Sequence, residues 1–117
     1  MATLNEGHER FEVDVLRLDD LALDRCDLLK IDIEGAEQLA FLGAVETIRR
    51  LRPIIISEIN PEVLRIVSGV SASQFVGFVE GLGYRAHSIT TAGPGPALET
   101  GFAKALTTLM NVAFLPT

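Results

Sequence analysis

The segment LLKIDIEGAE, residues 28–37, places charged side chains in what is otherwise a buried strand. Lys30, Asp32 and Glu34 occupy every second position, and alternate residues of a strand point to the same face. Burying an unpaired charge is costly, because the group loses its hydration. The charges therefore either form ion pairs, or the end of the strand opens onto a ligand-binding crevice.

A second carboxylate ends the next strand along the chain. Residues 53–59, PIIISEI, are a β-branched run typical of interior parallel strands, and Glu58 and Asn60 lie at its carboxyl end. Strands that are consecutive in sequence are usually neighbours, and open α/β sheets bind ligands outside the carboxyl ends of their strands. We therefore expect these two residues to share one rim with Asp32 and Glu34.

The rim residues have more than one interpretation. Paired carboxylates can act as a general base or bind a divalent cation, and the spacing alone does not choose between these roles. Asp32 and Glu34 have a structural alternative, because free N–H groups at the start of a helix favour carboxylates. A structural ion pair is the alternative for Lys30. Glu58 has the stronger functional case, because it ends an apolar strand, and Glu37 is predicted to be a solvated residue of the first helical turn.

Strands that alternate with helices indicate an α/β fold with a largely parallel sheet. The predicted elements, in order, are strands at 11–18 and 27–33, a helix over 34–51, a strand at 53–59, a short helix over 61–67, a helix from Ser71 or Ser73 to Gly83, a strand at 84–89, a loop at 90–101 and a strand at 111–116. Within the long helix, Gly43 is expected to mark a bend or a close packing contact. The last two strands have no helix between them, so antiparallel pairing is expected.

Composition narrows the class of protein. A chain of 117 residues is long enough for one domain, and 48% hydrophobic residues exclude a mainly disordered protein. A net charge of −6 argues against binding to nucleic acid. Arg49, Arg50 and Arg52 form a basic spot that could meet an anion, but a solvated helix end is the favoured interpretation. Cys26 is the sole cysteine, which excludes an internal disulfide and fits a cytoplasmic protein. No apolar run has the length of a membrane span, and residues 1–10 are predicted to be a disordered or frayed start.

Three stretches carry a resemblance to a known family: LRLDDLAL, then DLLKIDIEGAEQLAFLGA, then LRPIIISEI. Together they resemble the C-terminal half of FkbM-type S-adenosylmethionine-dependent methyltransferases, and KIDIEGAE is the most specific part. The resemblance covers residues 11–116. It implies the C-terminal half of a class I methyltransferase Rossmann-like sheet, mostly parallel with a final antiparallel strand.

The chain departs from that family at its start. Full members begin with a strand and a glycine-rich turn that holds the cofactor. Nothing before residue 11 supplies this turn, and the prolines of residues 93–96 lack the N–H groups that such a loop needs. Residues 11–117 are therefore expected to be a partial domain: a truncated product, an expressed fragment or one part of a split enzyme. Its open sheet edge predicts a homodimer, or association with a separate N-terminal half.

The resemblance implies S-adenosylmethionine as the cofactor and O-methylation of a small-molecule or sugar hydroxyl. Asp32 is expected to matter most, as a base or as an anchor for substrate or cofactor. The candidate catalytic residues are Asp32, Glu34 and Glu58, and the candidate substrate-binding residues are Lys30 and Asn60.

Two alternatives remain. One is a non-catalytic remnant or interaction module that oligomerises through its open edge. The other is a different α/β enzyme that binds a metal at the rim. That enzyme would need further ligands, for which the sequence offers only His87 and the pair Asp19 and Asp20.

Overall fold

The computed structural model describes residues 2–6 and 9–117, with side chains from Glu9 onward. The strands are β1 (Ala2–Glu6), β2 (Glu9–Val13), β3 (Leu28–Ile31), β4 (Ile54–Ile59), β5 (Tyr84–Thr90), β6 (Gly93–Ala97) and β7 (Met110–Pro116). The helices are α1 (Glu37–Leu42), α2 (Val45–Leu51), α3 (Pro61–Val63) and α4 (Ala72–Gly81), with helical turns η1 (Leu18–Leu21), η2 (Leu64–Ser68) and η3 (Phe102–Ala105).

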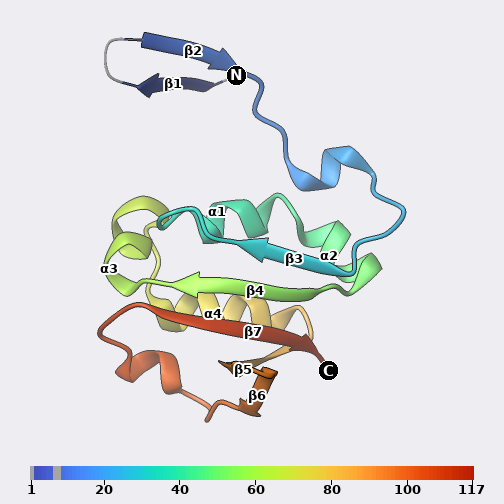
Figure 1. Cartoon of the computed structure of the whole chain (residues 1–117), viewed down its shortest axis with the longest axis vertical. Coiled ribbons are helices and arrows are strands. Elements are labelled where there is room, and N and C mark those ends of the chain that lie inside the picture. The colour runs from blue at the N-terminus through green and yellow to red at the C-terminus, as the bar shows by residue number, and fades with distance from the viewer. Residues whose placement is uncertain (1, 7–8) are drawn as a thin grey trace.

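The main sheet has five strands in the order β3-β4-β7-β5-β6 (Figure 1). The α/β class is confirmed, and β7 is the expected antiparallel strand, inserted between β4 and β5. The expectation of a mostly parallel sheet is wrong, because β3 and β4 form the one parallel pair among the described strands of this sheet. An antiparallel β7 in the middle gives both of its neighbours antiparallel pairings, and β6 adds a third. The sheet is therefore mixed.

The segment predicted as a loop over residues 90–101 contains a strand. Residues 93–97, GPGPA, form β6 and pair antiparallel with β5 across the register pair Thr90 and Gly93. Proline removes backbone donors, but an edge strand needs donors on one side only. Because β6 is the last strand of the sheet, two prolines fit there. The prediction of a loop was wrong because it rested on the Gly and Pro content alone. His87 joins this hairpin, with Nδ1 2.9 Å from the Gly95 carbonyl oxygen.

The single helix predicted over residues 34–51 is two helices. Both expectations for Gly43 are confirmed: α1 ends there, and a Cβ atom on Gly43 would lie 3.1 Å from the Arg17 Cβ. The first residues of the predicted helix form a turn instead, because Glu34 and Gly35 have φ angles of 53° and 96°. The predicted apolar face of this segment is confirmed for Phe41 and Ile48, which are fully buried.

The N-terminal region is a hairpin rather than part of the main sheet. The strand predicted at residues 11–18 is β2, which ends at Val13 and pairs antiparallel with β1. Residues 2–6, which fall in the segment predicted to be frayed, form β1. Figure 1 shows this hairpin standing clear of the sheet, joined to it by the segment that precedes η1.

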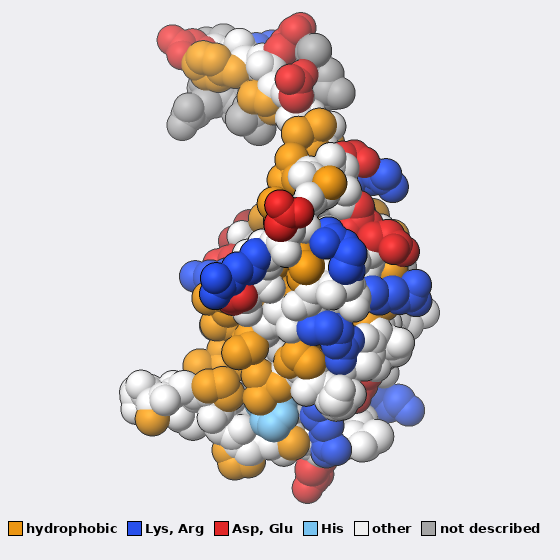
Figure 2. Space-filling view, turned by 90° about the vertical axis from the view of Figure 1, so that its right-hand side faces the viewer, with side chains coloured by type: hydrophobic (Ala, Val, Ile, Leu, Met, Phe, Trp, Pro, Cys, Tyr) orange, Lys and Arg blue, Asp and Glu red, His pale blue; other side chains and the backbone are white. Residues whose placement is uncertain are grey.

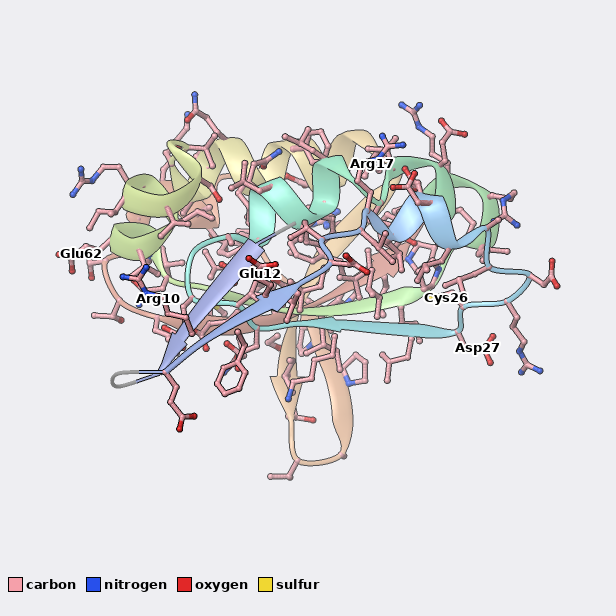
Figure 3. The ribbon with its side chains drawn as sticks, turned by 90° about the horizontal axis from the view of Figure 1, so that it is seen from above. Arg10, Glu12, Arg17, Cys26, Asp27 and Glu62 are labelled. Carbon is pink, nitrogen blue, oxygen red and sulfur yellow. The ribbon has the colours of Figure 1, made fainter. Side chains whose placement is uncertain are left out.

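Helices cover one face of the sheet. Figure 3, seen from above, places α1, α2 and α4 on one side, while the β5–β6 hairpin projects on the other. The core lies on the helix side, where Phe75 contacts Phe41 and Phe114 edge to face at ring distances of 5.3 and 6.2 Å. On β4, Ile55 and Ile59 face this core and are fully buried. Within the described residues no single helix has the length and apolar character of a membrane span; Pro61–Ser68 and Ala72–Gly81, bent by 78°, meet that test only as a pair.

The sequence suggested that Arg52 belongs to a solvated helix end, but the structure shows that its side chain binds other parts of the chain. Its guanidinium donates to the carbonyl oxygens of Leu82 (2.6 Å) and Gly83 (2.7 Å) and lies 4.8 Å over the ring of Tyr84. The Tyr84 hydroxyl donates to the Pro53 carbonyl oxygen at 2.6 Å. These contacts tie the turn before β4 to the turn before β5, so they fix the amino ends of the two strands relative to each other.

Candidate functional site

Three carboxylates converge at the carboxyl ends of β3 and β4. The register pairs Ile31 with Ser57, so the next residues, Asp32 and Glu58, leave the two parallel strands side by side. Carboxylate oxygens of Asp32, Glu34 and Glu58 lie within 4.8 Å of one another. We call these three residues the acidic rim. Their convergence agrees with the expectation from sequence.

Glu58 is the half-buried member of the acidic rim, and Asp32 and Glu34 are exposed. Partial burial raises the pKa of Glu58, and the neighbouring charge of Asp32 and its hydrogen bond raise it further. The charges of Glu34 and Glu37 act in the same direction. A carboxyl group whose pKa is shifted towards neutrality is a better general base at physiological pH.

Glu37 holds the turn that presents Glu34. Its carboxylate accepts hydrogen bonds from the backbone N–H groups of Ile33 (2.8 Å) and Gly35 (3.0 Å). The prediction of a solvated Glu37 is wrong, since its side chain is only 2% exposed. The physical reason is the left-handed turn at Glu34 and Gly35, which leaves two inward amides that need an acceptor. Its contacts give Glu37 a structural role beside the rim.

Gly35 brings this turn against the chain that follows β4. A Cβ atom at Gly35 would lie 2.3 Å from the Val63 carbonyl oxygen, and its φ of 96° also disfavours other residues. The Ser68 hydroxyl donates to the Gly35 carbonyl oxygen. The turn after β3 is thus packed on α3 and η2, which keeps the two strand ends, and their carboxylates, in fixed relation.

No ion pair or capping hydrogen bond of the described residues involves the two candidate substrate-binding residues, Lys30 and Asn60. Lys30 is exposed on β3, and the ion pairs of the described residues, Arg17–Asp20 and Arg25–Asp27, do not include it. Asn60 is half-buried at the start of α3, with Pro61 at the first helical position as expected, but its side chain makes no capping hydrogen bond. Both remain candidates for contacts with a substrate.

Asn111 extends the acidic rim to a third strand and was missed in the sequence. It is exposed on β7 and stands directly opposite Glu58 in the antiparallel register. Directly opposed residues of an antiparallel pair have Cβ atoms about 5 Å apart on one face. The available signal was the polar residue at the start of the last strand, but its neighbour could be known only after β7 was placed beside β4.

Charge is arranged unevenly along the strands. The carboxyl ends of β3 and β4 carry the acidic rim. At the amino ends lie Arg25, before β3, and Arg49 and Arg50 in the last turn of α2. Figure 2 shows the molecule from this opposite side, where Lys and Arg side chains gather over the body. The negative charge at the rim end of the sheet favours a cationic ligand over an anionic one.

Comparison with known families agrees with these features. The family model for the methyltransferase FkbM domain matches residues 2–86, a range that runs from the N-terminal hairpin to the third residue of β5 and contains the whole acidic rim. Searches of curated proteins and of solved structures find no match to this chain. Because the match covers well over half of its residues, the chain belongs to the FkbM methyltransferase domain family.

Proposed function

We propose that this chain acts in the S-adenosylmethionine-dependent methylation of a hydroxyl group on a small molecule or sugar. Membership of the FkbM family supports methyl transfer as the reaction class. The acidic rim is the observation that supports a particular location for the reaction, because half-buried Glu58 has a raised pKa there beside Asp32.

The carboxylates of the acidic rim are suited to the proton transfer that accompanies this reaction. S-adenosylmethionine, when bound, supplies a methyl group activated by a sulfonium. As the hydroxyl oxygen of the substrate takes the methyl group, its proton needs an acceptor, and we assign that role to Glu58. Asp32 and Glu34 accept hydrogen bonds from hydroxyl groups and so orient the oxygen for attack. Lys30, Asn60 and the opposed Asn111 are proposed to contact the rest of the substrate.

The described residues fit the cofactor in part. Carboxylates at the rim match ribose hydroxyls and the positive sulfonium. Two backbone amides of the turn after β3, those of Ile33 and Gly35, are not free for a ligand, because both donate to Glu37. Within residues 2–6 and 9–117, the glycine-rich stretch at 93–96 is an edge strand and not a turn after a strand. We therefore propose that these residues supply the acidic wall of the site, and that the glycine-rich turn comes from outside them.

Backbone NMR spectra of the chain, titrated with S-adenosylmethionine, test the assignment of the site. Shift changes confined to the turn after β3 and the end of β4 would support it, and they should shrink in Glu58→Gln. The matched control is Glu62→Gln, because Glu62 is exposed on α3 and is not part of the rim. Changes that map only to the other end of the strands would contradict the proposal.

A second candidate is a non-catalytic interaction module, and the open edge of β3 favours it. This candidate predicts self-association without any response to S-adenosylmethionine. The same titration separates the two, since the module leaves every rim signal unchanged while the chain remains folded.

A further inference from the structure

The outer edge of β3 is open. Within the described residues β3 pairs with β4 on one side and with no strand on the other. Such an edge presents unpaired N–H and C=O groups to solvent and invites another strand. The apolar side chain of Leu28 on this edge is 57% exposed. The edge therefore has both free hydrogen-bonding groups and uncovered apolar surface.

An apolar pocket of about 550 Å³ lies beside this edge. It is lined by side chains from β3, α1 and the segment before η1, among them Leu29, Ile31, Leu39, Val15 and Leu16. Val15 and Leu16 are 61% and 66% exposed, and Leu39 is 52% exposed. A strand added to β3 would direct alternate side chains into this pocket, the arrangement in which main-chain bonds give affinity and pockets give specificity.

The N-terminal hairpin has no third strand beside it among the described elements. β1 and β2 pair only with each other among the described elements, and a hairpin of two strands is marginally stable alone in water. One side of β2 carries Phe11, which is 49% exposed, and half-buried Val13. Figure 1 shows the hairpin joined to the body by a single connecting segment, and Figure 2 shows hydrophobic side chains along this narrow connection. The hairpin needs a surface to cover these residues.

The free edge of β2 and the open edge of β3 are complementary in sequence. An antiparallel alignment that sets Phe11 opposite Ile31 also sets Val13 opposite Leu29, on the pocket side. On the other side, the same alignment places Glu12 opposite Lys30 and Arg10 opposite Asp32. Opposed pairs of this kind stabilise antiparallel strands. One register therefore satisfies the apolar and the charged residues together.

We propose that two copies of this chain exchange their N-terminal hairpins, so that β2 of each copy pairs antiparallel with β3 of the other. Exchange of an identical element is a low-cost route to a symmetric dimer. The exit of the hairpin is fixed by Arg17, whose guanidinium bonds Asp20 at 2.8 Å, and by η1, whose Asp19 N–H donates to the Gly43 carbonyl oxygen at 2.9 Å. With the exit fixed in this way, the hairpin extends away from its own β3 (Figure 1).

The exchange also reaches the acidic rim. Arg10 of the second copy lies opposite Asp32 in this register, so it adds a basic group to one border of the rim. The inference itself stands on the open edge, the pocket and the hairpin, and it holds whether or not the chain transfers methyl groups. Its test needs no cofactor, so its failure and that of the proposed function are separable.

Light scattering after size exclusion measures the association of the full chain. The proposal predicts twice the chain mass of 12.7 kDa for the wild type and one chain mass for Phe11→Asp, whose new charge cannot enter an apolar pocket. Ile66→Asp is the matched control, because Ile66 is 63% exposed on η2 and belongs neither to the two strands nor to the pocket lining. A monomeric wild type, or dimerisation that Phe11→Asp leaves intact, would overturn the proposal.

A charge exchange tests the register. Glu12→Lys and Lys30→Glu should each raise the dissociation constant of the dimer about tenfold, because every dimer contains two copies of the pair. Combining the two substitutions in one chain should restore the wild-type value. Glu99→Lys, an equal charge change at an exposed loop position, should have little effect. Additive losses in the double variant would exclude this register.

Cross-linking separates exchange from folding back. One chain carries Val13→Cys and another carries Leu29→Cys, both in a Cys26→Ser background, so that a disulfide between them joins two copies. A covalent dimer on a non-reducing gel after oxidation is expected from the mixture. A chain that carries both new cysteines but closes the disulfide only within itself would show that the hairpin folds onto its own β3, which would overturn the exchange.

Discussion

In the proposed reaction Glu58 is the proton acceptor, because burial and the charge of Asp32 both oppose its ionisation and raise its pKa. Each cause comes from position rather than from residue type. The end of an interior strand brings Glu58 partly out of water, and the parallel pairing with β3 brings Asp32 beside it. The cost of ionising Glu58 in the folded chain is what would give the carboxylate its affinity for a proton.

The first prediction at this scale concerns pH. The folded pKa of Glu58 lies above its unfolded value of 4.5, so its contribution to stability is present below that value and is lost as pH rises through the folded pKa. Glu58→Gln lacks this loss. Melting temperatures between about pH 4 and pH 8 should therefore show the Gln variant gaining on the wild type as pH rises. A constant difference across that range, like that expected for Glu62→Gln, would mean that Glu58 ionises without cost.

The second prediction concerns Asp32. Its side chain is exposed, so Asp32→Ala should leave the circular dichroism spectrum and melting temperature nearly unchanged. In a form of the enzyme that transfers methyl groups, the same change should lower kcat/KM by about 10²–10⁴-fold. Full activity in Asp32→Ala would remove this residue from the mechanism. Glu80→Ala, at an exposed position on α4, is the control.

The acidic rim could be predicted from sequence, whereas its supports could not. Asp32, Glu34 and Glu58 follow two consecutive strands, and the carboxyl ends of parallel strands meet at one edge. The buried role of Glu37 depends on a left-handed turn at Glu34, a non-glycine residue that rarely adopts this conformation. The place of Asn111 depends on a strand that arrives some 50 residues after its neighbour β4. Both follow from three-dimensional contacts that local pattern does not encode.

At the scale of elements, the site depends on the turn that joins β3 to α1. Gly35 allows this turn to pack on the backbone of Val63, and Glu37 supplies the acceptor for its amides. β4 and β7 then fix the other side of the rim. The acidic rim is therefore held by backbone contacts between the ends of successive elements.

The third prediction uses two glycines that share a positive φ. Gly35→Ala should lower the free energy of unfolding by about 3 kcal/mol, because it adds a clash with the Val63 carbonyl to backbone strain. Gly69→Ala meets nothing within 4 Å and should cost about 1 kcal/mol, from strain alone. Urea denaturation of both variants gives the comparison. Equal losses would show that the close approach of the turn to α3 does not contribute to stability.

Element types were predictable where periodicity was strong, and boundaries were not. The apolar run of β4 and the stripe of α4, with Phe75 and Val79 fully buried, follow from pattern. The break between α1 and α2 has a signal in Gly43, but the turn at residues 34–36 continues a helical pattern that tertiary contacts override. The strand β6 was missed because Gly and Pro usually interrupt sheets, and only its edge position permits them.

At the scale of the whole molecule, the chain combines a covered body with an uncovered hairpin. The body has one hydrophobic core on the helix side of its sheet, and the hairpin has none of its own. In the sequence analysis, the open sheet edge alone predicted association. The hairpin was not expected to take part in it. The sequence pattern predicts the open edge of β3, which accepts a strand in the proposed dimer. It does not predict β2 as the donated strand, because only the structure separates β2 from the main sheet.

The fourth prediction follows from this division. The chain that lacks residues 1–13 should melt within about 3 °C of the monomeric Phe11→Asp variant, because the hairpin makes no sheet pairing with the body. The same deletion should also leave the chain monomeric, in contrast to the dimeric wild type. A body that unfolds without the hairpin would show that the two are one cooperative unit.

The central claim is that the acidic rim belongs to a methyl-transfer site. Calorimetric titration of the purified chain with S-adenosylmethionine and S-adenosylhomocysteine tests it most directly. The account predicts binding with a dissociation constant below about 1 mM for the wild type, weakened in Asp32→Ala, with S-adenosylmethionine favoured by its positive charge. A folded chain that releases no heat with either compound would contradict the account and leave the interaction module as the function of this fold.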